Sequence, residues 1–118
     1  MRYYDDKICS CSWIWQNAKT LNKKYAPFRS DLGKLLKEIK ENPQIGSDLG
    51  QKVRKVRMSI ESKGKGKSGG ARVLTYEALT LEKEKKIILL YIYDKSEISN
   101  VSDKFIKWLI KNNKDLLK

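Results

Sequence analysis

The sequence of 118 residues contains no histidine, only two cysteines and only two prolines. Without histidine, the usual forms of the catalytic triad are excluded and zinc chemistry loses a principal ligand. Cys9 and Cys11 stand two residues apart in a segment expected to be extended, where their Cα atoms are too separated for an easy disulfide. We therefore expect two reduced thiols and no metal or cofactor.

Long apolar segments are also lacking. No run approaches the roughly 18 residues of a membrane-spanning helix, and the N-terminus, MRYYDDKICSCSW, has no signal-peptide pattern. These absences predict a cytoplasmic protein without a membrane partner.

Acidic residues are few compared with basic ones, 14 against 26, which gives a formal net charge of +12. Such a surplus favours a polyanionic partner, and nucleic acid is the leading candidate. The alternative is a solvated surface whose lysines bind nothing specific. The apolar fraction of 40% is ordinary, and the length suits one domain with its own core, so we expect a single domain over residues 1–118.

Hydrophobic periodicity predicts three helices. Apolar residues at Ile14, Ala18, Leu21 and Tyr25 indicate a first helix that ends near Pro27, and a second carries Leu32, Leu35, Leu36 and Ile39 before Asn42-Pro43. Ser102 is a candidate N-cap for a final helix. Its expected inward stripe is Val101, Phe105, Trp108, Leu109 and Asn112.

Four strands are expected between and before these helices: a short one over Tyr3 to Cys9, then Val53 to Ile60, Arg72 to Leu79 and Ile87 to Tyr93. The last, IILLYIY, is apolar enough to be central and covered on both sides. Residues 44–50 and the glycine-rich residues 61–70 read as loops. The order β-α-α-β-β-β-α predicts an α+β fold with a mainly antiparallel sheet, a helical hairpin and a C-terminal helix. The helices are able to cover one face of the sheet and leave the other face partly open.

Positive charge is concentrated between positions 52 and 72, where the only acid is Glu61. A phosphate backbone would relieve the repulsion among these groups, and the neighbouring glycines let it approach closely. A solvated hairpin tip is the alternative. The loop is no nucleotide-binding P-loop, because Glu61 occupies a position that requires glycine and a strand follows instead of a helix. The cationic residues are Lys52, Arg54, Lys55, Arg57, Lys63, Lys65, Lys67 and Arg72.

Three segments together resemble the RelE/ParE toxin superfamily, nearest its HigB-like branch: Lys55-Val-Arg57, Lys63-Gly-Lys-Gly-Lys-Ser-Gly-Gly-Ala-Arg72 and Tyr93-Asp-Lys-Ser-Glu97. The resemblance covers nearly the whole chain. It implies the RelE-like fold and a type II toxin that a cognate antitoxin protein silences. It further implies that the protein enters the ribosomal A site and cleaves mRNA there without a metal.

Roles for individual residues follow from that chemistry. Attack of a ribose 2′-hydroxyl on phosphorus builds negative charge that guanidinium groups stabilise. Arg72, beside the glycine loop, is the first choice for this role. Arg57 is the second, and its alternative role is an ion pair with Glu61 or Glu77.

The proton donor and acceptor are less defined. Many family members place a histidine or glutamate in the site, and neither is found here, so the base is unassigned. Lys63, Lys65 and Lys67 are the pool, with Lys65 in the predicted catalytic set. Tyr93 and Lys95 fall where the family's C-terminal catalytic residues lie, and Tyr93 either stacks on a base, passes a proton to the leaving oxygen, or simply packs in the core.

The predicted catalytic set is therefore Arg57, Lys65, Arg72, Tyr93 and Lys95, and the predicted RNA-binding set is Lys52, Arg54, Lys55, Lys63 and Lys67. Two other functions stay open. One is inhibition of DNA gyrase, as in the ParE branch, and the other is nucleic-acid binding without catalysis. The first would leave transcripts intact and damage DNA, and the second would show salt-sensitive RNA binding without cleavage.

Overall fold

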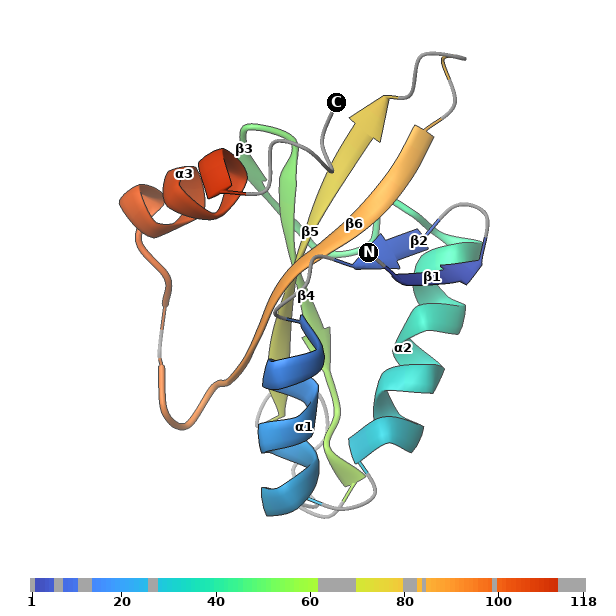
Figure 1. Ribbon diagram of the computed structural model, residues 1–118, viewed down its shortest axis with the longest axis vertical. Coiled ribbons are helices and arrows are strands. Elements are labelled where there is room, and N and C mark those ends of the chain that lie inside the picture. Colours follow the sequence, from blue (N-terminus) through green and yellow to red (C-terminus); the bar gives the residue numbers. More distant parts are fainter. Residues whose placement is uncertain are drawn as a thin grey trace.

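The computed structural model of the protein describes residues 2–5, 8–10, 14–25, 28–61, 70–79, 83, 85–98 and 100–112. In these residues one sheet is flanked by helices (Figure 1). Its elements are β1 (Arg2–Asp5), β2 (Ile8–Ser10), α1 (Ile14–Lys24), α2 (Phe28–Glu41), β3 (Ser47–Gly50), β4 (Val53–Met58), β5 (Ala71–Leu79), β6 (Lys85–Asp94) and α3 (Asp103–Asn112). The predicted α+β class is confirmed.

The sheet has six strands in the order β1-β2-β6-β5-β4-β3. Strands β3 to β6 form an antiparallel meander, whereas β2 runs parallel to β6 and pairs Ile8 with Ile87. The single N-terminal strand that was expected is in fact two, β1 and β2, which pair antiparallel with each other. The sheet is thus mainly antiparallel, as predicted, with one parallel pair.

A short edge strand, β3, lies within the segment 44–50 that was expected to be a loop. Gly50, Gln51 and Lys52 all have positive φ angles, 85°, 55° and 65°, and this left-handed run folds the chain back tightly. Asp48 supports the turn because its Oδ1 accepts a hydrogen bond of 2.8 Å from the Gly50 N–H. Ser47–Gly50 can therefore pair with β4, which sequence periodicity over so few residues does not reveal.

Helices α1 and α2 bury their apolar stripes against one face of the sheet. The predicted stripes are buried except for Tyr25 and Leu36, which are only partly buried. Phe28, at 0% exposure, extends the second stripe. They form one core with alternate residues of the strands, among them Val56, Val73 and Ile92. No helix in the described ranges is long and apolar enough to cross a membrane.

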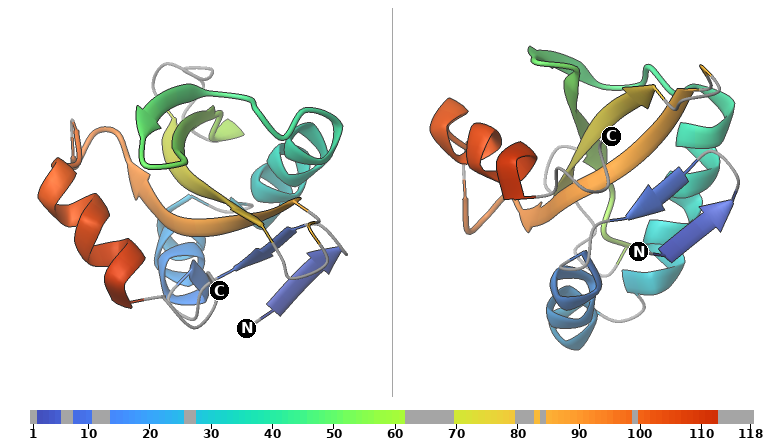
Figure 2. Two further views of the ribbon diagram at one scale, coloured as in Figure 1. Left: turned by 90° about the horizontal axis from the view of Figure 1, so that it is seen from above. Right: turned by 45° about the horizontal axis from the view of Figure 1, so that its top comes forward.

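Helix α3 packs on the opposite face, so the expectation that helices cover only one face is wrong. Ile106 and Leu109 join a second core with Val53, Leu74 and Leu90. Both further views place α2 and α3 on opposite sides of the central strands (Figure 2). Strand β6 is consequently buried on both faces, which explains its nearly unbroken apolar run and confirms its predicted central position.

The start of α3 matches its predicted cap, since the Phe105 N–H donates a hydrogen bond of 3.1 Å to Ser102 Oγ. Its predicted inward stripe is only partly right. Leu109 is buried, but Trp108 exposes 42% of its surface and Asn112 is also exposed. The helix is rotated so that Ile106 and Leu109 face the sheet, because that pair fills the second core.

Candidate functional site

The register of the central strands sets three polar side chains in one row. Arg57 on β4 lies opposite Arg72 on β5, and Arg72 lies opposite Tyr93 on β6. Directly paired residues project from the same face of a sheet with Cβ atoms roughly 5 Å apart. The row therefore joins three of the residues that the sequence suggested, on the face that also carries α3.

The two guanidinium groups differ in their surroundings. Arg57 is exposed, whereas Arg72 is 4% exposed and donates a hydrogen bond of 3.0 Å to the Ala71 carbonyl oxygen. Burial lowers the pKa of Arg72, and the positive charge of Arg57 lowers it further. Placing two cations side by side, one of them buried, costs free energy of folding. A bound anion would therefore stabilise the folded protein.

Arg57 forms no ion pair with an acidic residue in the described part of the chain. Glu61, one predicted partner, reaches Lys34 at 4.0 Å, and Glu77, the other, pairs with Lys85 at 3.3 Å. The register explains this, because Arg57 faces Arg72 and not an acid.

Tyr93 is buried, with 3% of its surface exposed, and its hydroxyl has no hydrogen-bond partner among the described residues. Burial raises the pKa of Tyr93, while the charge of Arg72 partly opposes that shift. The hydroxyl therefore keeps its proton at neutral pH. A buried hydroxyl without a partner costs free energy, and such costs are typical of functional sites.

A second row lies beside the first, two residues along each strand, and pairs Lys55, Leu74 and Tyr91. The ring of Tyr91 stacks against that of Tyr93 with centroids 5.9 Å apart. Lys55 Nζ donates a hydrogen bond of 3.4 Å to Asn100 Oδ1, which holds the ammonium group next to the segment leading into α3. Sequence reasoning missed Tyr91 and Asn100. The alternation of β6 puts Tyr91 on the face of Tyr93, but no sequence signal marks Asn100.

The end of β6 next to the row is fixed by a buried carboxylate on the other face. Asp94, 1% exposed, accepts hydrogen bonds from the hydroxyl of Tyr25 and from the backbone N–H and hydroxyl of Ser96. Glu97 forms an ion pair with Lys24, and this hydrogen bond raises the pKa of Lys24. Both acids thus organise the loop after β6.

Lys95, a predicted catalytic residue, is exposed just beyond the row. Its backbone N–H donates to the carbonyl oxygen of Gly70 at 3.2 Å, so the segments before Arg72 and after Tyr93 are held together. Lys63, Lys65 and Lys67 lie outside the described residues.

Gly70 permits a close approach between β5 and the chain after β4. A Cβ atom at this position would overlap the carbonyl oxygen of Met58 and come within 3.0 Å of the Ile60 nitrogen. Both neighbours are backbone atoms and cannot rotate away. The close packing of the two strands that carry the arginines therefore requires glycine at position 70, in the segment Gly-Gly-Ala-Arg72.

Gly70→Ala is expected to lower the free energy of unfolding by about 2 kcal/mol, because the two strands must separate to admit the methyl group. Urea denaturation of the two proteins measures the change. Gly33→Ala is the matched control. Gly33 lies in α2 with no atom within 4 Å of an added Cβ, so this change should raise stability by about 0.5–1 kcal/mol. Equal stability of Gly70→Ala and the parent would contradict the close packing.

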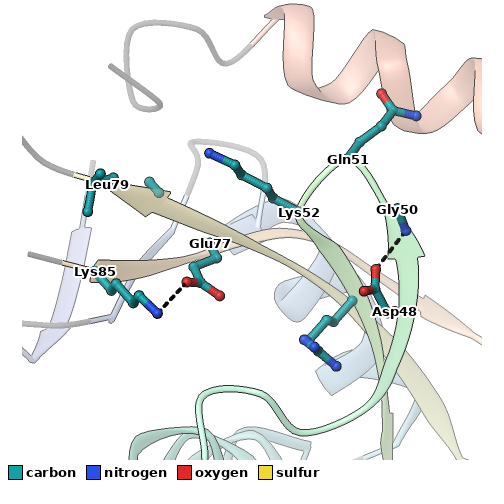
Figure 3. Close-up of a pocket in the computed structure, with 9 residues that line it drawn as sticks. Asp48, Gly50, Gln51, Lys52, Glu77, Leu79 and Lys85 are labelled. Carbon is teal, nitrogen blue, oxygen red and sulfur yellow. Dashed lines mark hydrogen bonds and ion pairs between the residues drawn. The ribbon is translucent and has the colours of Figure 1, made fainter.

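Two predicted RNA-binding residues lie elsewhere. Lys52 and Arg54 line a hollow of about 450 Å³ beside the turn after β3, together with acidic and apolar residues (Figure 3). The carbonyl oxygen of Lys52 pairs with the N–H of Glu77, which is five residues along β5 from Arg72, or about 17 Å. Arg54 pairs with Thr75, and strand alternation turns it to the face opposite Arg57. The expectation that all these cations converge is therefore wrong for this pair.

Residues 16–118 match the family model described as the RelE toxin of the RelE / RelB toxin-antitoxin system. The match includes all three strands of the row and all of the predicted site residues.

Proposed function

Because the chain belongs to the RelE toxin family of toxin–antitoxin systems, we propose that it is an endoribonuclease that cuts mRNA in the ribosomal A site. Its partners are then a cognate antitoxin, translating ribosomes and the mRNA that they hold, and its place of action is the cytoplasm. The family match supports the toxin role, and the cutting of mRNA is our inference from the site.

The observation that carries the proposal is the row of Arg57, Arg72 and Tyr93. It combines two adjacent guanidinium groups with a protonated, buried hydroxyl that no described residue engages. The oxygens of a phosphodiester can accept hydrogen bonds from both arginines and from the Tyr93 hydroxyl, which has no partner among the described residues. The alternative, a basic surface that is only solvated, does not explain why one guanidinium group is buried beside another.

The row suits cleavage by an internal attack. The ribose 2′-oxygen bonds to the adjacent phosphorus, and the bond from phosphorus to the 5′-oxygen of the next nucleotide breaks. The products are a 2′,3′-cyclic phosphate and a new 5′-hydroxyl. Arg72 and Arg57 stabilise the negative charge that grows on the non-bridging oxygens. Tyr93 gives its proton to the leaving 5′-oxygen.

The group that removes the proton from the 2′-hydroxyl is a lysine in this proposal. Lys65, with Lys63 and Lys67 as alternatives, lies in the sequence between β4 and β5. Lysines near other cations lose their proton more easily than isolated ones, which allows them to act as bases. Lys95 and Lys55 lie at the edge of the row and hold the flanking phosphates.

Induction of the protein in translating cells, followed by mapping of new transcript 5′ ends, tests the proposal. We expect growth arrest together with new 5′ ends inside translated reading frames, and no such ends when the antitoxin is co-expressed. Growth arrest with intact transcripts and broken DNA would instead indicate an attack on gyrase. RNA binding without any new 5′ ends would leave only a binding module.

A further inference from the structure

Four aromatic rings run in contact from the candidate site to the surface of α3. Tyr93 stacks on Tyr91, and Tyr91 meets the ring of Phe105 edge to face at 5.1 Å. Phe105 in turn stacks on Trp108, with centroids 5.8 Å apart and planes only 13° from parallel. The outermost ring is thus connected to the hydroxyl of Tyr93 through direct ring contacts.

Trp108 is a large apolar side chain left 42% exposed, although the second core is completed by other residues of the same helix, Ile106 and Leu109. An open hollow of about 400 Å³ lies against it, lined by Ser102, Lys104, Phe105 and Trp108. The second core therefore does not require the indole to be placed where it is.

Charge frames the indole on both sides along the helix. Lys104, Trp108 and Lys111 are spaced i, i+4 and i+7, so they share one face of α3, and both lysines are exposed. An aromatic ring between two ammonium groups offers a flat surface for a base and two charges for the phosphates beside it. The same face is thus complementary to a single-stranded polynucleotide.

We propose that Trp108 is a stacking site for a nucleobase of the same RNA strand that is cut at the row of Arg57, Arg72 and Tyr93. This inference rests on the proposed function and extends it with a second contact on α3. One strand then has its phosphate over the arginines and a nearby base on the indole, with Lys104 and Lys111 holding the backbone. A site of this kind reads no sequence, because every base presents a flat aromatic face.

The test compares Trp108→Leu with Trp108→Phe. Leucine keeps the apolar bulk and removes the aromatic face, whereas phenylalanine keeps an aromatic face. The probe is a fluorescent single-stranded RNA of about ten nucleotides with 2′-O-methyl riboses, which cannot undergo internal attack. We expect Trp108→Leu to weaken binding about ten-fold in fluorescence anisotropy, and Trp108→Phe to weaken it by less than about three-fold.

Leu79→Ala is the matched control. Leu79 is 54% exposed and lines the separate hollow of Figure 3, so its loss should leave RNA affinity unchanged. Urea denaturation of each variant shows whether α3 still packs, and the phenylalanine variant keeps the comparison meaningful if leucine loosens the helix.

The proposal is wrong if Trp108→Leu binds the RNA as tightly as the parent, or if both Trp108 variants lose affinity equally. It is also wrong if RNA affinity is unchanged while the complex with the antitoxin weakens, since the face would then dock a protein. Failure of the proposed function looks different. In that case ordinary mRNA is not cut, while binding of the 2′-O-methyl RNA still distinguishes the leucine from the phenylalanine variant.

Discussion

Arg72→Ala is expected to abolish growth arrest and to slow mRNA cleavage by about 10²–10³-fold, the usual cost of removing one pre-positioned donor from a transition-state anion. Arg72 is the central residue of the row and is held in place by burial and by its hydrogen bond to Ala71. Its guanidinium group therefore needs little reorganisation when charge develops on the phosphorane. Arg72→Lys should recover only part of the rate, because lysine keeps the charge and loses the planar fork.

The measurement is single-turnover cleavage of an mRNA on purified ribosomes, with reverse transcription to locate the new 5′ ends. Arg29→Ala is the matched control, since Arg29 is exposed on α2 and its loss removes the same charge. It should cut like the parent. If Arg72→Ala unfolds at the same urea concentration as the parent and still cleaves mRNA at the parent's rate, the row does not stabilise the transition state.

Tyr93→Phe is expected to separate activity from stability. Loss of the hydroxyl removes the proposed proton donor and should slow cleavage by about 10²-fold. The same change removes a buried hydroxyl that lacks a partner among the described residues, so stability should rise by about 1 kcal/mol. Because the ring contact with Tyr91 is retained, the packing of β6 is undisturbed.

The pH dependence of stability checks the surroundings of Tyr93 independently of catalysis. Burial raises the pKa of Tyr93 above its ordinary value, which is about 10. The folded protein therefore holds this proton more tightly than the unfolded chain does. The resulting stabilisation is complete below the unfolded value and is lost as the pH rises through the folded one. Urea denaturation should show the stability advantage of Tyr93→Phe growing above about pH 10. A constant difference would mean that Tyr93 is not buried as described.

Much of the fold is readable from local patterns, because each pattern reflects one buried face. The stripes of α1 and α2, the cap at Ser102 and the apolar run of β6 all predict their elements, since the periods of helix and strand dictate which residues meet the core. The short strands β1, β2 and β3 were not separable in this way. Three or four residues are too few for a period, and their pairing depends on turns such as the left-handed run after Gly50.

The sequence predicted which residues belong to the candidate site, but not how they are arranged relative to one another. Which residue of β5 faces Arg57 depends on register, and β5 and β6 shift register between Leu74 and Thr75. No pattern in the sequence marks that shift, so the alignment of Arg72 with Tyr93 was not derivable. The alternation of side chains along β4 predicts that Arg54 and Arg57 lie on opposite faces. Grouping the cations only by their position along the chain ignores this alternation.

Trp108 shows a different limit. Its spacing of three from Phe105 fits an inward stripe, but the apolar arc of α3 is wide enough to be rotated in more than one way. Packing of Ile106 and Leu109 into the second core selects the rotation. Tertiary contact, and not the helical period, thus decides that the indole reaches the surface.

The parallel pairing of β2 with β6 affects the order in which the sheet assembles during synthesis. It joins Ile8 to Ile87, which lie much farther apart in the sequence than the paired residues of any hairpin of the meander, so closing this contact costs more conformational entropy. During synthesis β2 must wait until β6 has left the exit tunnel, so the six-stranded sheet is completed only after Asp94 has emerged.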